Sequence, residues 1–205
     1  MLARILQADG RGPTIVFCRT KRTAQKTSDD LFERGFRAAT IHGDLGQSAR
    51  EKALNDFKAG KSDVLIATDV AARGIDIDGI THVINYQCPE DEKTYVHRIG
   101  RTARAGAAGI AVTFVDWDEL ARWKMIDTAL VLGLPEPVET YSSSEHLFEM
   151  LNIPAGSTGR MTKKSATAVE KPKNDRPKSE KAVEPKKPAA DRVKRERTRT
   201  KRISE

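Results

Sequence analysis

The chain has 205 residues and a formal net charge of +7, a length that suits one domain of ordinary size with or without a tail. The charge is divided unevenly, because residues 160–205 hold 17 Lys and Arg against 7 Asp and Glu, whereas residues 1–159 hold 19 basic and 22 acidic residues. This division excludes a generally basic surface on the first part of the chain, and the lack of a long apolar run or a signal-like start predicts a cytoplasmic protein without membrane association.

Short apolar runs alternate with segments of helical pattern over the first three quarters of the chain. Strands are expected at 14–18, 36–41, 63–67, 81–86 and 109–115, where β-branched and aromatic residues are frequent. Helices are expected at 2–8, 21–34, 48–59, 91–101, 118–133 and 144–151, with Thr20 capping the second. Because the strands are apolar rather than alternating, they should pair in parallel with helices on both faces. The sequence therefore predicts an α/β domain of three layers with a mostly parallel sheet.

The composition changes after Pro154. Lys, Arg, Pro, Ser, Ala and Glu dominate the rest of the chain, and no aromatic residue occurs there. Such a segment cannot bury enough apolar surface to offset the entropy cost of ordering it. We therefore expect one domain at 1–153 and a disordered basic tail at 154–205, whose charge either attracts a polyanion in a salt-sensitive way or merely aids solubility.

Three arginines follow His97 at a spacing of three residues: Arg98, Arg101 and Arg104. Residues three apart share a face of a helix, and no acidic residue lies among these three to neutralise them. Guanidinium groups pair with phosphate oxygens and stay charged at any working pH, so the pattern indicates an anion site. The alternative is a solvated helix end, which Gly100 disfavours because glycine costs about 1 kcal/mol inside a helix.

The segment after the third expected strand carries a second polar cluster. Thr68 and Asp69 could present backbone amides and a hydroxyl to a phosphate, and Asp76 could accept a hydrogen bond from a sugar hydroxyl. Gly74 allows a positive φ angle or a close approach of the backbone to a ligand. Taken singly, Asp69 is also explained as a helix cap and Asp76 as a turn former. Because loops at the carboxyl ends of parallel strands meet at one edge, this cluster should join the loops after the first two strands.

Two cysteines, Cys18 and Cys88, lie 70 residues apart and form no CxxC pair. Both have apolar neighbours, so we interpret them as small core residues of a protein in a reducing compartment. No metal site is expected within this chain.

Four segments occur in a fixed order at suitable distances: Ile15–Lys21, His42–Glu51, Ala67–Asp76 and His97–Arg104. Together they resemble the second RecA-like domain of a DEAD-box RNA helicase, closest to the bacterial RhlE-like branch, over residues 1–153. The histidine that opens the fourth segment favours the DEAD-box group over the related DEAH enzymes, where a glutamine stands at that place. The resemblance implies a RecA-like fold and the C-terminal half of an ATP-dependent RNA helicase.

The resemblance implies roles in an ATP site for four residues. Arg101 and Arg104 match the catalytic arginine fingers that reach across the interdomain cleft to the γ-phosphate, an effect worth roughly 10³–10⁵ in rate in related nucleotide hydrolases. Asp76 matches the residue that contacts the ribose, and Gly74 belongs to the same nucleotide-binding loop.

The resemblance also implies contacts with RNA and with another domain. His97 and Arg98 match interdomain positions, of which His97 links to the acidic motif of the first domain when the cleft closes. Phe17 matches an aromatic residue that packs near the arginine motif, although a strand Phe is also explained as core. The residues implied to hold RNA come from the loops after the first three strands: Thr20, Gly43, Gln47, Arg50, Thr68, Asp69 and Arg73.

The chain departs from a complete helicase in two ways. Ala103 stands where the family usually has glycine, and we expect it to be tolerated at a helical position. A P-loop for ATP and an acidic motif for Mg²⁺ are missing, because both belong to the first domain. Gly60–Ser62 looks like part of a phosphate loop, but it lies between a helix and a strand, whereas a working P-loop follows a strand and opens a helix. We therefore expect that this chain needs a first RecA-like domain to hydrolyse ATP, without being an obligate oligomer.

Two other functions stay open from the sequence alone. The chain could be a non-catalytic RNA-binding module that acts through its basic tail. It could also be part of a double-stranded DNA translocase of the same superfamily, because contacts to the phosphate backbone carry no sequence information. The sequence leaves open which RNA is the substrate, which partner the tail has, and whether the chain is a fragment or a truncated gene product.

Overall fold

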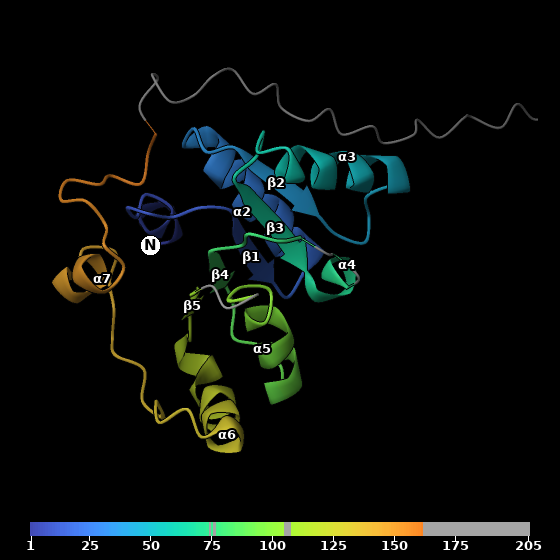
Figure 1. The fold of residues 1–205 in the computed structure, drawn as a ribbon. Coiled ribbons are helices and arrows are strands. Elements are labelled where there is room, and N and C mark those ends of the chain that lie inside the picture. The colour runs from blue at the N-terminus through green and yellow to red at the C-terminus, as the bar shows by residue number, and fades with distance from the viewer. Residues whose placement is uncertain (74, 76, 105–107, 162–205) are drawn as a thin grey trace, which may run out of the picture. The chain divides into compact units, whose positions relative to one another are not determined.

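The computed structural model describes residues 1–73, 75, 77–104 and 108–161, and Figure 1 shows their arrangement. The strands are β1 (Thr14–Cys18), β2 (Ala38–Ile41), β3 (Val64–Thr68), β4 (His82–Asn85) and β5 (Ile110–Thr113). The helices are α1 (Leu2–Ile5), α2 (Lys21–Glu33), α3 (Gln47–Lys58), α4 (Asp69–Ala72), α5 (Glu92–Ile99), α6 (Leu120–Leu130) and α7 (Glu145–Met150), with a 3₁₀ helix, η1 (Trp117–Glu119), before α6. Strands and helices alternate as the sequence predicted.

The five strands form one sheet in the order β2-β3-β1-β4-β5, and every neighbouring pair is parallel. In its centre, Val16 of β1 lies opposite Ile66 of β3 on one side and Ile84 of β4 on the other. The predicted parallel sheet is confirmed. Because all five strands point the same way, the segments that follow them start at one edge of the sheet.

Side chains of the central strands alternate between two apolar clusters, one on each face of the sheet. On one face, Val16 and Ile66 pack with residues of α1, α2 and α7. On the other face, Ile15 and Leu65 pack with residues of α3 and α4. All residues of β1 and β3 are therefore buried, which explains why these strands are continuous apolar runs in the sequence. Figure 1 shows the resulting layers, with helices on both faces of the sheet.

A third apolar cluster joins α5 to α6. It contains Cys88, Tyr95, Trp123 and Ile126. The rings of Tyr95 and Trp123 meet edge to face with their centroids 5.7 Å apart, a geometry worth about 0.5–1.5 kcal/mol beyond the buried area. The Trp123 indole donates a hydrogen bond of 2.7 Å to the Leu134 carbonyl. This cluster holds α5 against α6 and against the segment that follows β4.

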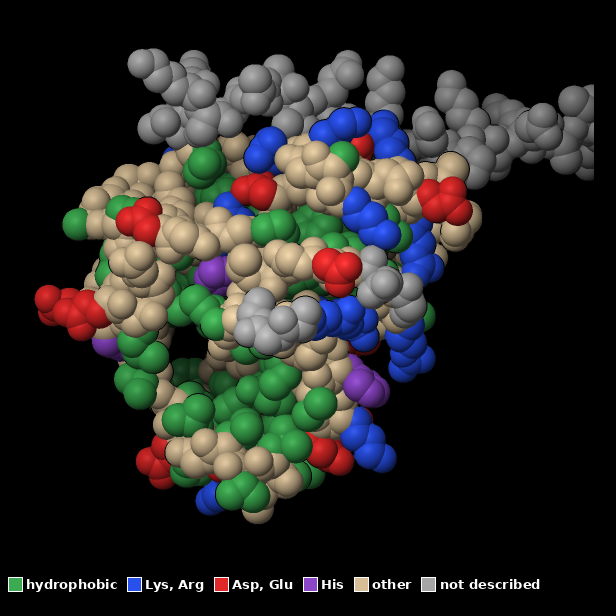
Figure 2. Space-filling view, viewed as in Figure 1, with side chains coloured by type: hydrophobic (Ala, Val, Ile, Leu, Met, Phe, Trp, Pro, Cys, Tyr) green, Lys and Arg blue, Asp and Glu red, His purple; other side chains and the backbone are tan. Residues whose placement is uncertain are grey.

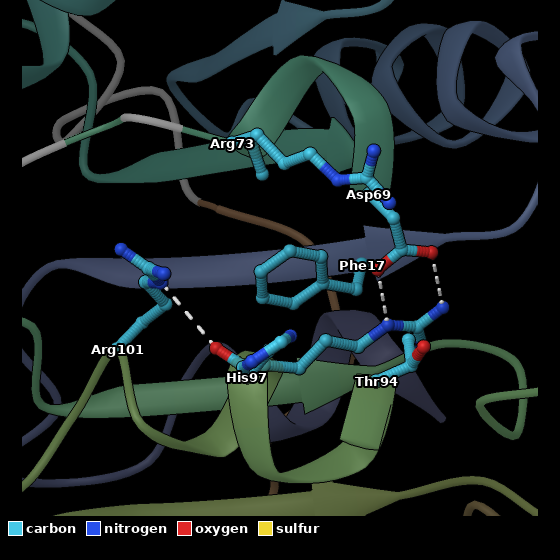
Figure 3. A pocket seen from close by; sticks show the side chains of 8 residues that line it. Phe17, Asp69, Arg73, Thr94, His97 and Arg101 are labelled. Carbon is cyan, nitrogen blue, oxygen red and sulfur yellow. Dashed lines mark hydrogen bonds and ion pairs between the residues drawn. The ribbon is translucent and has the colours of Figure 1, made fainter. Parts of the chain in front are cut away.

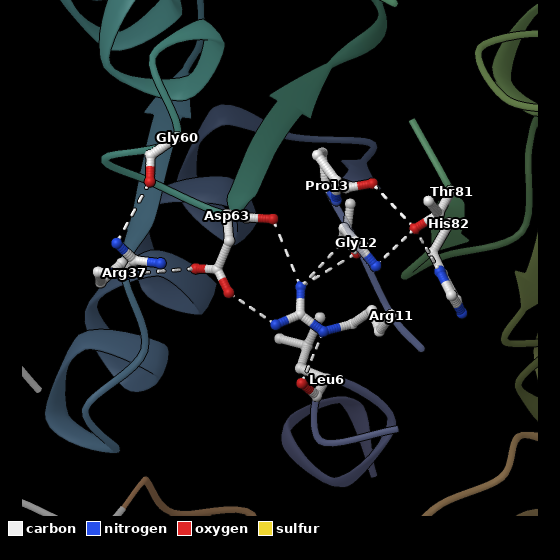
Figure 4. A network of polar contacts seen from close by, with 10 residues as sticks. Leu6, Arg11, Gly12, Pro13, Arg37, Gly60, Asp63, Thr81 and His82 are labelled. Atoms are coloured by element: carbon white, nitrogen blue, oxygen red, sulfur yellow. Dashed lines mark hydrogen bonds and ion pairs between the residues drawn. The ribbon is translucent and has the colours of Figure 1, made fainter. Parts of the chain in front are cut away.

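The amino ends of the central strands are held by a polar network around Arg11 (Figure 4). The Arg11 side chain is 8% exposed, and its Nη2 lies 2.7 Å from Asp63 Oδ2. Its Nε donates to the Leu6 carbonyl at 2.7 Å, which ties in the end of α1. Nearby, the Gly12 amide donates to Thr81 Oγ1 at 2.9 Å. The network joins the segments before β1, β3 and β4 at the edge opposite to the predicted site.

The packed part of the chain continues past the end of the predicted domain. The Gly159 amide donates to Gln7 Oε1 at 2.7 Å, and the Met161 amide donates to the Arg34 carbonyl at 2.8 Å. The Met161 side chain also packs against the apolar cluster that contains α1 and α2. Composition did not predict this packing, because it depends on a few backbone groups that find partners far away in sequence. The rest of the predicted tail, residues 162–205, lies outside the described residues.

The helices are short. Among the described residues, the longest helix is α2 with 13 residues, and no helix there is long and apolar enough to cross a bilayer. The sequence did not predict α4, which has four residues, and it predicted most of η1, which has three, only as the start of the helix at 118–133. Elements of one turn or less are too short to show a helical period in the sequence.

Candidate functional site

The segments that follow β1, β2, β3 and β4 each lead into a helix at the same edge of the sheet. Thr20 caps α2, because its Oγ1 accepts a hydrogen bond of 3.0 Å from the Thr23 amide. Asp91 caps α5 in the same way, through a bond of 2.7 Å from the Thr94 amide. The predicted cap at Thr20 is confirmed. Helix N-termini and loops gathered at one edge give a surface rich in backbone donors.

A hollow of about 270 Å³ opens at this edge, between the segment after β3 and helix α5 (Figure 3). Its lining residues are Phe17, Asp69, Ala72, Arg73, Thr94, His97, Arg98 and Arg101. Arg73 and His97 are exposed, and Arg101 is half-buried. Asp69 is the one carboxylate among these described lining residues. The structure therefore brings the third and fourth sequence motifs together at one cavity.

Arg98 was predicted at an interdomain position, and its side chain is buried within this domain at the hollow. The residue is 1% exposed, and its Nε and Nη2 donate to the two carboxylate oxygens of Asp69 at 2.7 and 2.8 Å. Its Nη1 donates to Asn85 Oδ1 at 3.2 Å and to the Gln87 carbonyl at 3.1 Å. The guanidinium carbon lies 5.4 Å from the centre of the Phe17 ring. The prediction that all three arginines share an un-neutralised face is wrong, because a carboxylate distant in sequence pairs with Arg98.

Arg101 and Arg104 lie beyond the end of α5, in a turn that starts at Gly100. Arg101 Nη1 donates to the Ile75 carbonyl at 3.0 Å, and Arg104 Nε donates to the Gly100 carbonyl at 3.2 Å. Both side chains are half-buried. In these contacts both guanidinium groups donate to backbone carbonyls of the same edge of the sheet.

Ala103 adopts a left-handed backbone conformation with φ of +56°. The prediction of a helical position is wrong here, because the helix has already ended at Ile99. For an L-residue with a side chain this conformation costs roughly 1–2 kcal/mol, which explains why a glycine suits the position better. The neighbouring Thr102 is buried and donates to the Ile80 carbonyl at 2.6 Å. This bond anchors the turn directly before Ala103.

The residues predicted to hold RNA differ in exposure. Thr20, Gly43, Gln47 and Arg73 are exposed, Arg50 and Asp69 are half-buried, and Thr68 is buried. Arg50 Nη2 donates to the Ala71 carbonyl at 2.6 Å, which joins α3 to α4. The second and third motifs are therefore in direct contact, and their exposed members lie on the same edge of the sheet.

His42 is buried and holds the turn after β2. Its Nε2 lies 3.3 Å from Gln25 Oε1, and its Nδ1 accepts a hydrogen bond of 3.3 Å from the Asp44 amide. Burial lowers the pKa of His42, so the neutral ring is favoured. The Asp44 carboxylate pairs with Lys21 at 2.8 Å, and this hydrogen bond lowers the pKa of Asp44. The sequence motif contained His42, but the contact of its side chain with Gln25 could not be predicted, because it depends on where α2 packs.

Glu119 is a buried residue that the sequence did not single out. It is 4% exposed and pairs with Arg19 Nη2 at 2.8 Å. Its Oε2 also accepts a hydrogen bond of 3.2 Å from the Cys88 amide. The pair ties the loop after β1 to the end of η1, a contact between residues 100 positions apart that no local pattern reveals.

The predicted core cysteines are confirmed as buried free thiols. Burial raises the pKa of Cys18 to about 11 and the pKa of Cys88 to about 11. Within the described residues, no group of three or more His, Cys, Asp or Glu side chains is arranged to hold a metal ion.

The remaining predictions concern three residues, Gly74, Asp76 and Gly60. Gly74 and Asp76, which were predicted to contact the nucleotide, lie outside the described residues. Gly60 follows the end of α3 with φ of +69°, so the stretch that looks like a phosphate loop is a helix stop, as the sequence predicted.

Lysine and arginine side chains gather on the side of the domain occupied by α3, α4 and α5 (Figure 2). The exposed members include Lys52 and Lys58 of α3 together with Arg73 and Lys93. The first 159 residues have more acidic than basic side chains, so this clustering is local. The charge balance of the sequence predicted that any nucleic-acid site on this domain would be a local cluster of basic side chains, and this patch is such a cluster.

The comparisons with known proteins agree with this geometry. The model of the helicase conserved C-terminal domain matches residues 1–106. The ATP-dependent RNA helicase CshA of Listeria monocytogenes is 51% identical over 127 residues, which are 62% of this chain and 24% of that protein. Among solved structures, the C-terminal domain of the DEAD-box protein Dbp5 has a TM-score of 0.58 and 38% identity, over 63% of this chain and 76% of that one.

A second solved structure is the E. coli DEAD-box protein SrmB bound to regulator of ribonuclease activity A, with a TM-score of 0.61 and 33% identity over 70% of this chain and 88% of that one. The chain spans about a quarter of the length of the CshA relative. The RhlE-like branch stays a prediction.

Proposed function

The chain belongs to the helicase conserved C-terminal domain family, as the C-terminal domain of a DEAD-box protein, and we propose that it completes an ATP site whose other half lies on a first RecA-like domain. The observation that supports this most is the hollow at the carboxyl edge of the sheet, where Arg73, His97 and Arg101 gather. Asp69, the one carboxylate among the described lining residues of the hollow, is paired with Arg98. An anion that enters the hollow would therefore meet cationic groups and no unpaired carboxylate of these residues.

In this proposal Arg101 and Arg104 act as the catalytic fingers. Their guanidinium groups follow α5 in a turn held by Thr102, and they are bonded here to backbone carbonyls. The Ile75 carbonyl that holds Arg101 is a neutral acceptor, from which this side chain can turn toward a γ-phosphate. Fixed guanidiniums stabilise the charge that builds up in phosphoryl transfer. Mg²⁺ would be held by the acidic motif of the first domain, and Gly74 and Asp76 would contact the nucleotide.

RNA is the proposed substrate of the same edge. Thr20, Gly43, Gln47 and Arg73 are exposed there, and α3 and α4 are fixed to each other through Arg50. Backbone amides, hydroxyls and guanidiniums contact the phosphate backbone without reading sequence. His97, which is exposed at the hollow, would meet the acidic motif of the first domain when both domains close on ATP and RNA. We also propose that the protein acts in the cytoplasm.

The test joins this chain to the first RecA-like domain of a DEAD-box relative, either by fusion or in trans. We expect RNA-stimulated ATP hydrolysis that neither part shows alone. Arg101→Ala and Arg104→Ala should each lower the rate by about 10³-fold or more, the range measured for arginine fingers. Lys124→Ala, at an exposed position of α6 and outside both the basic patch and the hollow, is a control that should keep the rate. Restored hydrolysis that survives both arginine substitutions would refute the proposal.

The alternatives are separated by two binding measurements on the chain itself. Competition between RNA and DNA of one sequence tests whether a 2′-hydroxyl is recognised. The role of the tail is tested by measuring the RNA affinity of residues 1–161 and of the full chain at two salt concentrations. A steep salt dependence of the affinity that disappears when the tail is removed would favour a non-catalytic RNA-binding module.

A further inference from the structure

Arg98 connects four elements of the domain through its side chain. It belongs to α5, pairs with Asp69 at the start of α4, bonds Asn85 in β4 and lies over the Phe17 ring of β1. The Gln87 carbonyl in the segment after β4 accepts another of its bonds. All three guanidinium nitrogens therefore have an acceptor within the domain.

A buried guanidinium is a costly way to join elements that apolar side chains could also join. Removing a charge from water costs several kcal/mol, and replacing a buried ion pair by apolar residues is often neutral or stabilising. What the pair of Arg98 and Asp69 adds is geometry, because two parallel bonds of 2.7 and 2.8 Å fix both distance and orientation. The start of α4 is thereby locked to the last turn of α5.

The loops predicted to hold RNA reach Arg98 through short contacts. Asp69 begins α4, which α3 contacts through the bond from Arg50 to the Ala71 carbonyl. On the other side, the Arg19 amide, next to Thr20, donates to Gln87 Oε1 at 3.1 Å. A displacement of either loop therefore changes the surroundings of the Arg98 guanidinium.

Arg98 also reaches the finger turn through its own backbone. Its carbonyl accepts a hydrogen bond of 3.1 Å from the Arg101 amide, and the next carbonyl, of Ile99, accepts one of 3.0 Å from Thr102. A shift of Arg98 within α5 is therefore passed directly to the turn that carries Arg101 and Arg104.

We propose that Arg98 is a positioning residue that transmits the placement of the RNA-facing loops to the arginine fingers. The inference rests on the proposed function and adds the physical link between its two halves. With RNA bound, the loops after β1 and β3 hold Gln87 and Asp69, these residues fix Arg98, and Arg98 fixes the turn that presents Arg101. Without this link, RNA still binds but no longer accelerates hydrolysis to the same extent.

The test measures ATP hydrolysis of the full chain fused behind a first RecA-like domain, with and without single-stranded oligouridylate as the RNA probe. Arg98→Lys keeps the positive charge but cannot form two parallel bonds. We expect the ratio of stimulated to unstimulated rates to fall about fivefold or more, the lower end of typical coupling between sites. Asp69→Asn should have a similar effect, and the double variant should add little, because both substitutions interrupt one link.

Arg11→Lys is the matched control for lost stability. Arg11 is also a buried arginine paired with an aspartate at 2.7 Å, but at the opposite edge of the sheet. Thermal unfolding of each variant identifies an assay temperature at which all variants are folded. At that temperature Arg11→Lys should keep the full ratio of RNA-stimulated to unstimulated hydrolysis rates. A normal ratio in Arg98→Lys, or an equal loss in Arg11→Lys, refutes the link. An unsubstituted fusion that RNA does not stimulate refutes the proposed function, and this inference with it.

Discussion

Ala103→Gly should stabilise the domain, although glycine usually destabilises. Ala103 is exposed, so the substitution removes no buried contact, and its φ of +56° lies in the region that only glycine adopts freely. The alanine costs roughly 1–2 kcal/mol in this conformation. Glycine loses more entropy on folding, which offsets about 0.5–1 kcal/mol of that gain. The net expectation is a rise of about 0.5–1 kcal/mol in the free energy of unfolding.

Thermal and urea unfolding, followed by circular dichroism, measure this change. For a domain of this size a stabilisation of 1 kcal/mol raises Tm by roughly 2–4 °C. Ala49→Gly is the control, because Ala49 is also exposed but lies within α3, where glycine costs up to about 1 kcal/mol. Opposite signs for the two substitutions are expected. A loss of stability in Ala103→Gly would show that the turn after α5 is not left-handed, and the account of this motif would fail.

Three further predictions follow from buried and capping groups. Thr20→Ala should lower the free energy of unfolding by about 1 kcal/mol, because it removes the cap on the Thr23 amide; unchanged urea unfolding would contradict this. Burial lowers the pKa of His42 and of His82, so the unfolded chain takes up protons first as the pH falls through about 6.5. Stability should therefore be complete above that pH and decline toward pH 5 in urea titrations, and a constant midpoint would refute the assignment. Because the pKa of each cysteine is raised to about 11, iodoacetamide at pH 8 should label the folded chain far more slowly than the urea-unfolded chain, and equal rates would show that the thiols are accessible.

The sequence predicted the elements well because their signals are local. The apolar run Thr14–Cys18 was expected as a strand and is one, and the cap at Thr20 forms as its residue type suggests. Helix α4 escaped prediction, since its four residues directly follow a strand and show no helical period of their own. The packing of Met161 on the domain also escaped, because composition does not indicate a backbone partner as distant as Arg34.

The sequence indicated where the candidate site lies in the fold but not the contacts within it. The order of the motifs, together with the rule for parallel sheets, correctly indicated that the segment after β3 and helix α5 share one edge. Spacing alone suggested that Arg98, Arg101 and Arg104 act alike, yet they divide into one buried and two half-buried side chains.

Residue types and their spacing thus determined by themselves that this protein has a parallel sheet, helices between its strands, and polar loops gathered at one edge. Only the tertiary structure decided which charges meet. Asp69 and Arg98 lie 29 positions apart, and a pairing of that kind depends on how two strands and a helix pack, which no local pattern encodes. The physical reason is that propensity and periodicity act over a few residues, whereas the neutralisation of a charge is settled by whatever side chain the fold brings within hydrogen-bonding distance.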